Sequence, residues 1–142
     1  MSLVVVGSAP RLDVGRLRRC GALLLRGLGR EREELTLSLV DDAAIRELNR
    51  DYRGKRLATD VLSFSLLEGD HGKHRGGLLG DVVISVETAA RQARERHRSL
   101  DETVIRLLIH GMLHVVGHDH EQLEEARAMR SEERRLWRIV RP

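Results

Sequence analysis

Four of the seven histidines in this 142-residue chain lie between residues 110 and 120. His110 and His114 are four residues apart, so a helix would place both rings on one face, about 40° apart and one turn from each other. Gly117 can adopt the left-handed conformation that ends a helix, which lets the chain turn back and brings His120 to a third ligand position. The spacing therefore predicts one Zn²⁺ per chain, held by His110, His114 and His120, with the open fourth position that is typical of catalytic zinc.

The alternative for such a cluster is purely structural, because single histidines in apolar helices are usually hydrogen-bonded core side chains. Two rings in one apolar helix would leave several ring nitrogens without partners, and this favours the metal site. His118 adjoins the turn and has the poorer spacing. We expect it to be either a residue that hydrogen-bonds to a ligand or an exposed one.

The spacing H-x-x-x-H-x-x-G-x-x-H is that of the metzincin peptidases, which carry a glutamate directly after the first histidine as general base. Gly111 occupies that position here and can transfer no proton. A peptidase mechanism of that kind is therefore disfavoured, although a bound metal would still lower the pKa of its water.

The elements that must position these residues follow from apolar periodicity, turn residues and caps. The last helix should bury Leu123, Ala126, Met129, Leu136 and Ile139 or Val140. The pattern predicts strands over 3–6, 34–40, 61–66 and 82–86, and helices over 11–28, from Asp41 or Asp42 to Tyr52, over 87–98, from the Ser99–Glu102 capping box through Val116, and over 122–140, with a glycine-rich loop over 69–77.

The helix that carries His110 and His114 is apolar nearly all round, so we expect it at the centre of the domain. The predicted fold class is α+β with a three-layer α/β/α-like arrangement. It comprises a small mixed sheet of about four strands, about five surrounding helices and a metal site on the central buried helix. One metal-dependent hydrolase domain is expected over residues 1–142.

Composition narrows the possible partners. Aromatic residues make up only 2% of the chain, which argues against RNA-binding modules that stack bases on an aromatic sheet. The single Cys20 excludes an intramolecular disulfide and a multi-cysteine zinc site, and its apolar neighbours predict a buried thiol. No apolar stretch is long enough for a membrane span or a signal peptide, so we expect a soluble cytoplasmic protein without a membrane partner.

The charge balance is a weak signal by itself. Lys and Arg total 25 against 22 Asp and Glu, which gives a net charge of +3. Nearly all of the basic residues are arginine, and arginine pairs bidentately with phosphate, so a polyanionic partner is compatible with the composition.

Four blocks of the sequence form a recognisable set. They are Leu48-Asn49-x-x-Tyr52-Arg53-Gly54, Thr59-Asp60-Val61-Leu62-Ser63-Phe64, Gly80-Asp81-Val82-Val83-Ile84 and His110-Gly111-x-Leu113-His114-x-x-Gly117-x-Asp119-His120. Together they resemble the YbeY-type rRNA maturation factors, a family of small bacterial metal-dependent endoribonucleases. The resemblance covers most of the chain from about residue 35 onward, with departures at Leu57, Ala58 and His118.

The resemblance implies zinc held by His110, His114 and His120, and catalytic roles for Arg53 and His114. It also implies cleavage of single-stranded ribosomal RNA, with the small ribosomal subunit as partner. The implied processes are maturation of the small-subunit rRNA 3′ end and ribosome quality control. From its residue type alone, Arg53 would be read as a surface arginine. Phosphodiester cleavage fits a metal and an arginine, because both stabilise charge on the non-bridging oxygens.

Three further residues keep two readings each. Asp81 either hydrogen-bonds to a histidine ligand or makes a turn contact at the start of a strand. Asp119 either hydrogen-bonds to a histidine ligand or caps the last helix. Arg106 either approaches the site or pairs with a carboxylate. Two other functions stay open: a ribosome-assembly binding factor with a structural metal, and a zinc hydrolase of a substrate other than RNA.

Overall fold

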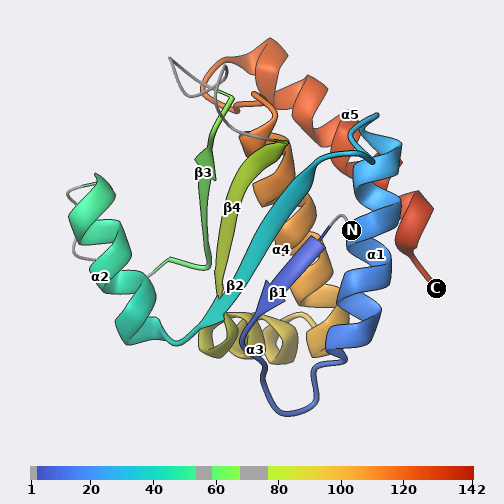
Figure 1. Cartoon of the computed structure of the whole chain (residues 1–142). Coiled ribbons are helices and arrows are strands. Elements are labelled where there is room, and N and C mark those ends of the chain that lie inside the picture. The colour runs from blue at the N-terminus through green and yellow to red at the C-terminus, as the bar shows by residue number, and fades with distance from the viewer. Residues whose placement is uncertain (1–2, 54–58, 68–76) are drawn as a thin grey trace.

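A computed structural model of the chain describes residues 3–53, 59–67 and 77–142. The described residues form four strands and five helices around one sheet (Figure 1). In chain order these are β1 (Leu3–Val6), α1 (Val14–Gly27), β2 (Glu34–Val40), α2 (Asp42–Arg53), β3 (Val61–Ser65), β4 (Leu78–Ser85), α3 (Val86–Glu95), α4 (Leu100–Val115) and α5 (Leu123–Val140).

The sheet is mixed and has the strand order β1-β2-β4-β3. β1, β2 and β4 are parallel, whereas β3 pairs antiparallel with β4, with Ser63 opposite Val82. The predicted α+β class and the four-strand mixed sheet are confirmed.

Helices cover both faces of the sheet. On one face, Val82 packs against Gly111 of α4. Its neighbour Val83 points to the opposite face and packs with Leu62 and with Ile45 of α2. α1 lies beside α4, and α5 packs outside both (Figure 1). This arrangement has the three layers that the sequence predicted.

α4 is the central helix, as its apolar sequence predicted. Leu108, Ile109, Met112 and Leu113 are almost completely buried in the main core. Cys20 of α1 is buried in the same core. None of the described helices is both long and apolar enough to cross a membrane.

The predicted burial of α5 is correct for its later turns and wrong at its start. Met129, Leu136 and Val140 are buried. Leu123 is 64% exposed because it opens the helix before its apolar face reaches the core, and Ile139 is 39% exposed. Of the two alternatives at the end of the helix, Val140 is therefore the core residue.

Several element boundaries differ from the sequence prediction, among them the end of α3, which lies at Glu95 rather than Arg98. Two of the differences have clear local reasons. β4 begins at Leu78 rather than Val82, because Gly80 has a φ of 152° and the register with β2 shifts there, which breaks the alternation that marks a strand. α1 begins at Val14 rather than Arg11, since the Asp13 side chain caps it by accepting from the Arg16 amide. The loop predicted over 69–77 lies, except for Gly77, outside the described residues.

Candidate metal centre

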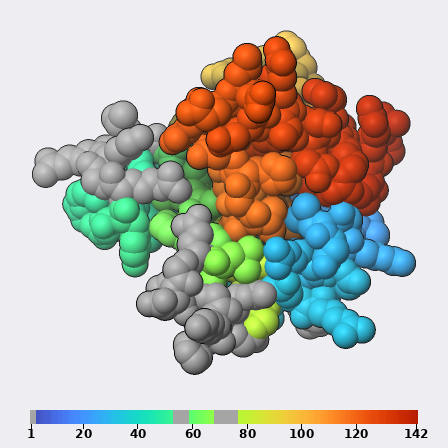
Figure 2. All heavy atoms as spheres, turned by 90° about the horizontal axis from the view of Figure 1, so that it is seen from above, coloured from blue at the N-terminus to red at the C-terminus, as the bar shows by residue number. Residues whose placement is uncertain are grey.

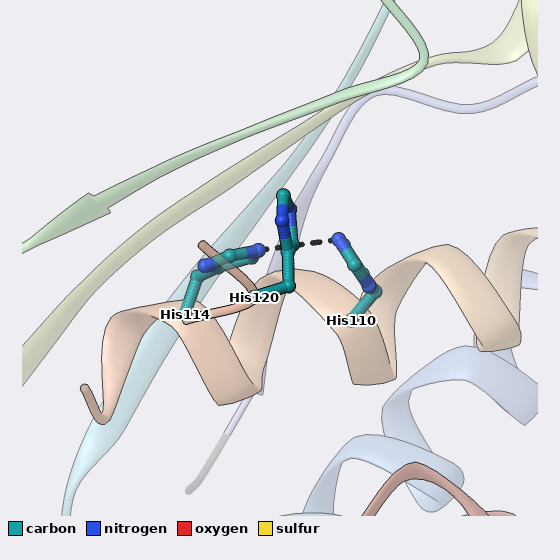
Figure 3. Close-up of side chains that lie close together, drawn as sticks. All are labelled: His110, His114 and His120. Atoms are coloured by element: carbon teal, nitrogen blue, oxygen red, sulfur yellow. Dashed lines mark hydrogen bonds between the residues drawn. The ribbon is translucent and has the colours of Figure 1, made fainter. Parts of the chain in front are cut away.

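The last two turns of α4 place His110 and His114 side by side. Their Nε2 atoms are 3.2 Å apart and their ring centroids 4.7 Å apart. Figure 3 shows both rings, together with that of His120, turned toward one common point. The i, i+4 spacing read from the sequence therefore brings the two rings onto one face, as predicted.

The turn after α4 brings His120 to the other two histidines. Gly117 has a φ of 104°, its amide donates to the His114 carbonyl, and the His118 amide donates to the Leu113 carbonyl. This pair of bonds is a Schellman motif, which reverses the chain at a helix end. The His120 ring centroid then lies 5.3 Å from that of His114 and 6.0 Å from that of His110.

These three side chains, which we call the histidine cluster, offer one nitrogen each within 4.8 Å of one another. Two nitrogens bound at about 2.0–2.1 Å to a tetrahedral ion lie about 3.3 Å apart, close to the separation of the His110 and His114 Nε2 atoms. Burial, and then the neighbouring His110 and His120, lower the pKa of His114. A neutral imidazole is the form that binds a metal, so the cluster can hold a metal ion.

Glu133 of α5 contacts His110, and sequence reasoning missed it. Its Oε1 atom lies 3.7 Å from His110 Nδ1, and this contact lowers the pKa of Glu133. A carboxylate at this position favours the tautomer of a neutral His110 that carries its proton on Nδ1, and that tautomer leaves Nε2 free to bind a metal ion. In the sequence Glu133 is one of many charged residues on a helix with alternating charge, and no local signal separates it from Glu132.

Two hydroxyl groups of β3 hold the histidine-bearing turns of α4 against the sheet. Ser63 Oγ donates to the Gly111 carbonyl at 3.0 Å, and Ser65 Oγ donates to the Val115 carbonyl at 2.7 Å. A Cβ at Gly111 would lie 2.7 Å from Val82 Cγ1. Position 111 therefore faces the sheet, so a glutamate general base like that of the metzincins has neither room nor access to the histidine cluster there.

A cleft of about 650 Å³ opens beside the histidine cluster, between β3 and the turn that follows α4. Three carboxylates line it. Asp60 accepts from Gln92 at 3.0 Å, and Asp119 accepts from the His120 amide at 2.7 Å. Glu121 is exposed and makes no ion pair within the described ranges. The full lining among described residues is Thr59, Asp60, Val61, Ser63, Ser65, His110, His114, Gly117, His118, Asp119, His120 and Glu121.

The other residues near the predicted site take different places. Asp119 does not cap α5, whose N-cap is Gln122, but holds the backbone of His120. His118 is half-buried and lines the cleft, outside the group of converging nitrogens. Arg106 pairs with Glu102 at 3.2 Å, which is the second of its two readings, and stacks over Trp137.

Asp81 does not join the histidine cluster, and Arg53 belongs to α2 with a side chain that the structure does not describe. Asp81 follows Gly80 and precedes Val82 in β4, so strand alternation turns it away from the α4 face on which Val82 lies. Partial burial raises its pKa although the residue is exposed overall. Arg53 is the last residue of α2, and its side chain lies outside the described part.

Comparison with known proteins gives a family match over most of the chain. The family model described as endoribonuclease YbeY matches residues 22–140. The endoribonuclease YbeY of Geobacter sulfurreducens is 40% identical over 144 residues, which cover 99% of this chain and 96% of that protein. That of Anaeromyxobacter sp. (strain Fw109-5) is 50% identical over 123 residues, 87% of this chain and 62% of that longer protein.

A solved structure has the same fold. The solution structure of TM1509 from Thermotoga maritima matches 95% of this chain and 89% of its own length, with a TM-score of 0.62 and 24% identity. The family match extends over both histidine-bearing elements of the candidate metal centre. On these matches, which confirm the resemblance seen in the sequence motifs, the chain belongs to the endoribonuclease YbeY family.

Proposed function

We propose that this protein is a zinc-dependent endoribonuclease that cuts single-stranded ribosomal RNA in the cytoplasm. Its substrate would be the 3′ end of the small-subunit rRNA, and its partner the small ribosomal subunit. The observation that carries the proposal is the convergence of His110, His114 and His120 at the wall of a large polar cleft. Family membership supplies the reaction class.

The donor set fits zinc better than the hard cations. Three imidazole nitrogens with no carboxylate among them suit Zn²⁺, whereas Mg²⁺ and Ca²⁺ prefer oxygen ligands. When bound, Zn²⁺ would act as a Lewis acid toward a phosphate oxygen and lower the pKa of a water molecule at its open position.

The residues of the chain supply orientation, charge and proton transfer. Glu133 keeps the Nδ1 proton on His110, so that its Nε2 lone pair points into the histidine cluster. In this proposal Glu121, whose carboxylate is exposed in the cleft, accepts a proton from the attacking water. Arg53 at the end of α2 would neutralise charge on a non-bridging phosphate oxygen.

The test compares metal content with cleavage on the same samples. Purified protein should contain about one zinc per chain, and a chelator should remove both the metal and the cleavage of a single-stranded RNA from the small-subunit 3′ end. Added Zn²⁺ should restore both. A matched RNA duplex and casein serve as controls and should stay intact.

Three outcomes would contradict the proposal. Equal cleavage by fully metal-free protein would remove the metal from the mechanism. Nuclease activity that separates from the protein on further purification, while ribosome association persists, would favour a binding factor with a structural metal. Digestion of casein in place of RNA would indicate a hydrolase of another substrate.

A further inference from the structure

A second, smaller hollow lies on the α5 side of the histidine cluster. It has a volume of about 250 Å³ and is lined by Arg106, Arg130, Glu133, Arg134 and Trp137. We call it the arginine groove. Figure 2 looks down on this end of the molecule, where the orange and red residues that end α4 and form α5 make up much of the exposed surface.

The arginine groove and the cleft are joined by a pair of contacting side chains. Glu133 lines the arginine groove, and its carboxylate lies 3.7 Å from His110 Nδ1. His110 in turn lines the cleft. An extended polymer whose bond is cut at the histidine cluster would therefore meet the arginine groove directly beside that point.

Two of the three arginines that line the arginine groove have no ion-pair partner among the described residues. Arg130 and Arg134 are one turn apart on α5 and exposed, and neither makes an ion pair with another described residue. Arg135, by contrast, forms an ion pair with Glu132 on the same helix. Glu133 pairs with His110, so it is not the counter-ion of either arginine in the described part of the chain. Like charges gathered this way repel unless an anion lies between them.

Arg106 is fixed in place before any ligand arrives. Its Nε donates to Glu102 at 3.2 Å, and its guanidinium carbon lies 4.0 Å from the centroid of the Trp137 ring. A guanidinium held over an aromatic ring loses little freedom when it binds a phosphate, so the entropic cost of binding is small. Arginine also matches a phosphate group with two parallel hydrogen bonds.

We propose that the arginine groove binds a backbone phosphate of the RNA strand adjacent to the bond that is cut at the histidine cluster. This inference rests on the proposed function, because it takes RNA as the substrate. Since phosphates are the same at every nucleotide, binding at the arginine groove is independent of sequence and depends strongly on salt.

The test uses zinc-loaded protein and the double variant Arg130→Ala/Arg134→Ala. Binding of a labelled 12-nucleotide single-stranded RNA is followed by fluorescence anisotropy from 50 to 200 mM KCl, and read before cleavage begins. The affinity at 50 mM should fall about tenfold, and the slope of log K against log salt should lose about 0.7 per phosphate contact removed. KM should rise with kcat and zinc content unchanged.

Two matched variants separate a binding site from a general charge effect. Arg94→Ala/Arg96→Ala removes the same charge from exposed positions at the end of α3, at the opposite end of the sheet (Figure 1), and should leave affinity and slope nearly unchanged. Arg130→Lys/Arg134→Lys keeps the charge and should retain most of the salt slope. It should also lose part of the affinity, because lysine cannot bind a phosphate with two parallel bonds.

The outcomes separate this inference from the proposed function. A wild-type protein that binds no RNA overturns both. A wild-type protein that binds and cuts RNA, with an alanine variant that binds equally well at every salt concentration, overturns the arginine groove alone. An equal loss in the α3 control overturns it as well, since the effect would then be that of net charge.

Discussion

Two clusters of polar side chains lie at opposite ends of the sheet (Figure 1). They differ in whether the polar groups in each cluster are paired as hydrogen-bond donors and acceptors. Where α2 and α3 begin, the Asp42 cluster consists of Asp42, Ser85, Thr88 and Arg91. Asp42 accepts from both hydroxyl groups and from the Arg91 guanidinium. Each donor there has an acceptor within the protein.

The histidine cluster at the C-terminal end of α4 is built from like groups instead. Nitrogens of three imidazoles lie close to one another, and the carboxylate of Glu133 lies beside the far ring nitrogen of His110. Three imidazole nitrogens that converge can hold a cation, whereas the donors of the Asp42 cluster already have their acceptors. The Asp42 cluster is therefore suited to stability, and the role proposed for the histidine cluster is binding, a division that substitutions can test.

The largest effect is expected from His114→Ala. Removing one of three ligands should reduce zinc content at equal zinc concentration to near zero and lower RNA cleavage at least about 1000-fold, while the fold persists because His114 is only half-buried. Metal analysis and cleavage rates on the same samples check this. His97→Asn, at an exposed left-handed position after α3, is the control and should keep both. Full zinc content in His114→Ala would show that the cluster is not the metal site.

Glu133→Gln should weaken zinc binding by about 10- to 100-fold. The amide no longer holds a proton on His110 Nδ1 through a charged acceptor, so the ring is less basic and less well oriented. Competition with a chelating dye measures the affinity without using activity. Glu132→Gln, which breaks the ion pair with Arg135 on the same helix, should change the zinc affinity less than threefold. An equal loss in both variants would assign the effect to the charge of α5.

The histidine cluster was predictable from sequence because helix period and a glycine turn act locally. The i, i+4 spacing of His110 and His114 and the reversal at Gly117 need no information about the rest of the fold. The spacing also indicated zinc, and the resemblance then supplied the reaction and its RNA substrate. The same local logic predicted α4 as the central helix and Ser99 as its cap, which accepts from the Glu102 amide.

What the sequence could not supply depends on packing between distant elements. Glu133 meets His110 only because α5 returns along α4, and Ser63 meets Gly111 only through the position of β3 beside β4. Asp41 and Asp42 were equal candidates for capping α2. The structure uses Asp41, which accepts from the Ala44 amide, and turns Asp42 toward α3. Leu123 was expected in the core because periodicity does not show where along α5 the core begins.

Gly111→Ala should destabilise the fold by about 1–3 kcal/mol, because the added Cβ overlaps Val82 in the tightly packed contact between α4 and β4. Urea unfolding of the metal-free protein measures this directly. Gly15→Ala in α1 is the matched control. Its Cβ would have only ordinary contacts at 3.4 Å, so helix propensity should make that variant neutral or more stable by up to about 1 kcal/mol. If both variants are destabilised equally, the close packing of α4 against β4 is not the cause of the effect.

Asp42→Asn should have the smallest effect, a loss of about 1–2 kcal/mol at neutral pH with zinc affinity and cleavage unchanged. Hydrogen bonds from Ser85 and Thr88 lower the pKa of Asp42 from 3.8 to about 2 in the folded protein. Because the folded pKa is the lower one, the stabilisation is complete above about pH 5 and is lost as the pH falls through 3.8 toward 2.

Urea unfolding at pH 7 and at steps below pH 4 follows this loss, and the difference between Asp42→Asn and the parent protein should shrink over that interval. Asp51→Asn on the same helix breaks only an exposed pair with Arg50 and should cost less than about 0.5 kcal/mol at every pH. A fall in zinc affinity in Asp42→Asn would mean that the two ends of the sheet are coupled, and the division between a stabilising cluster and a binding cluster would then not hold.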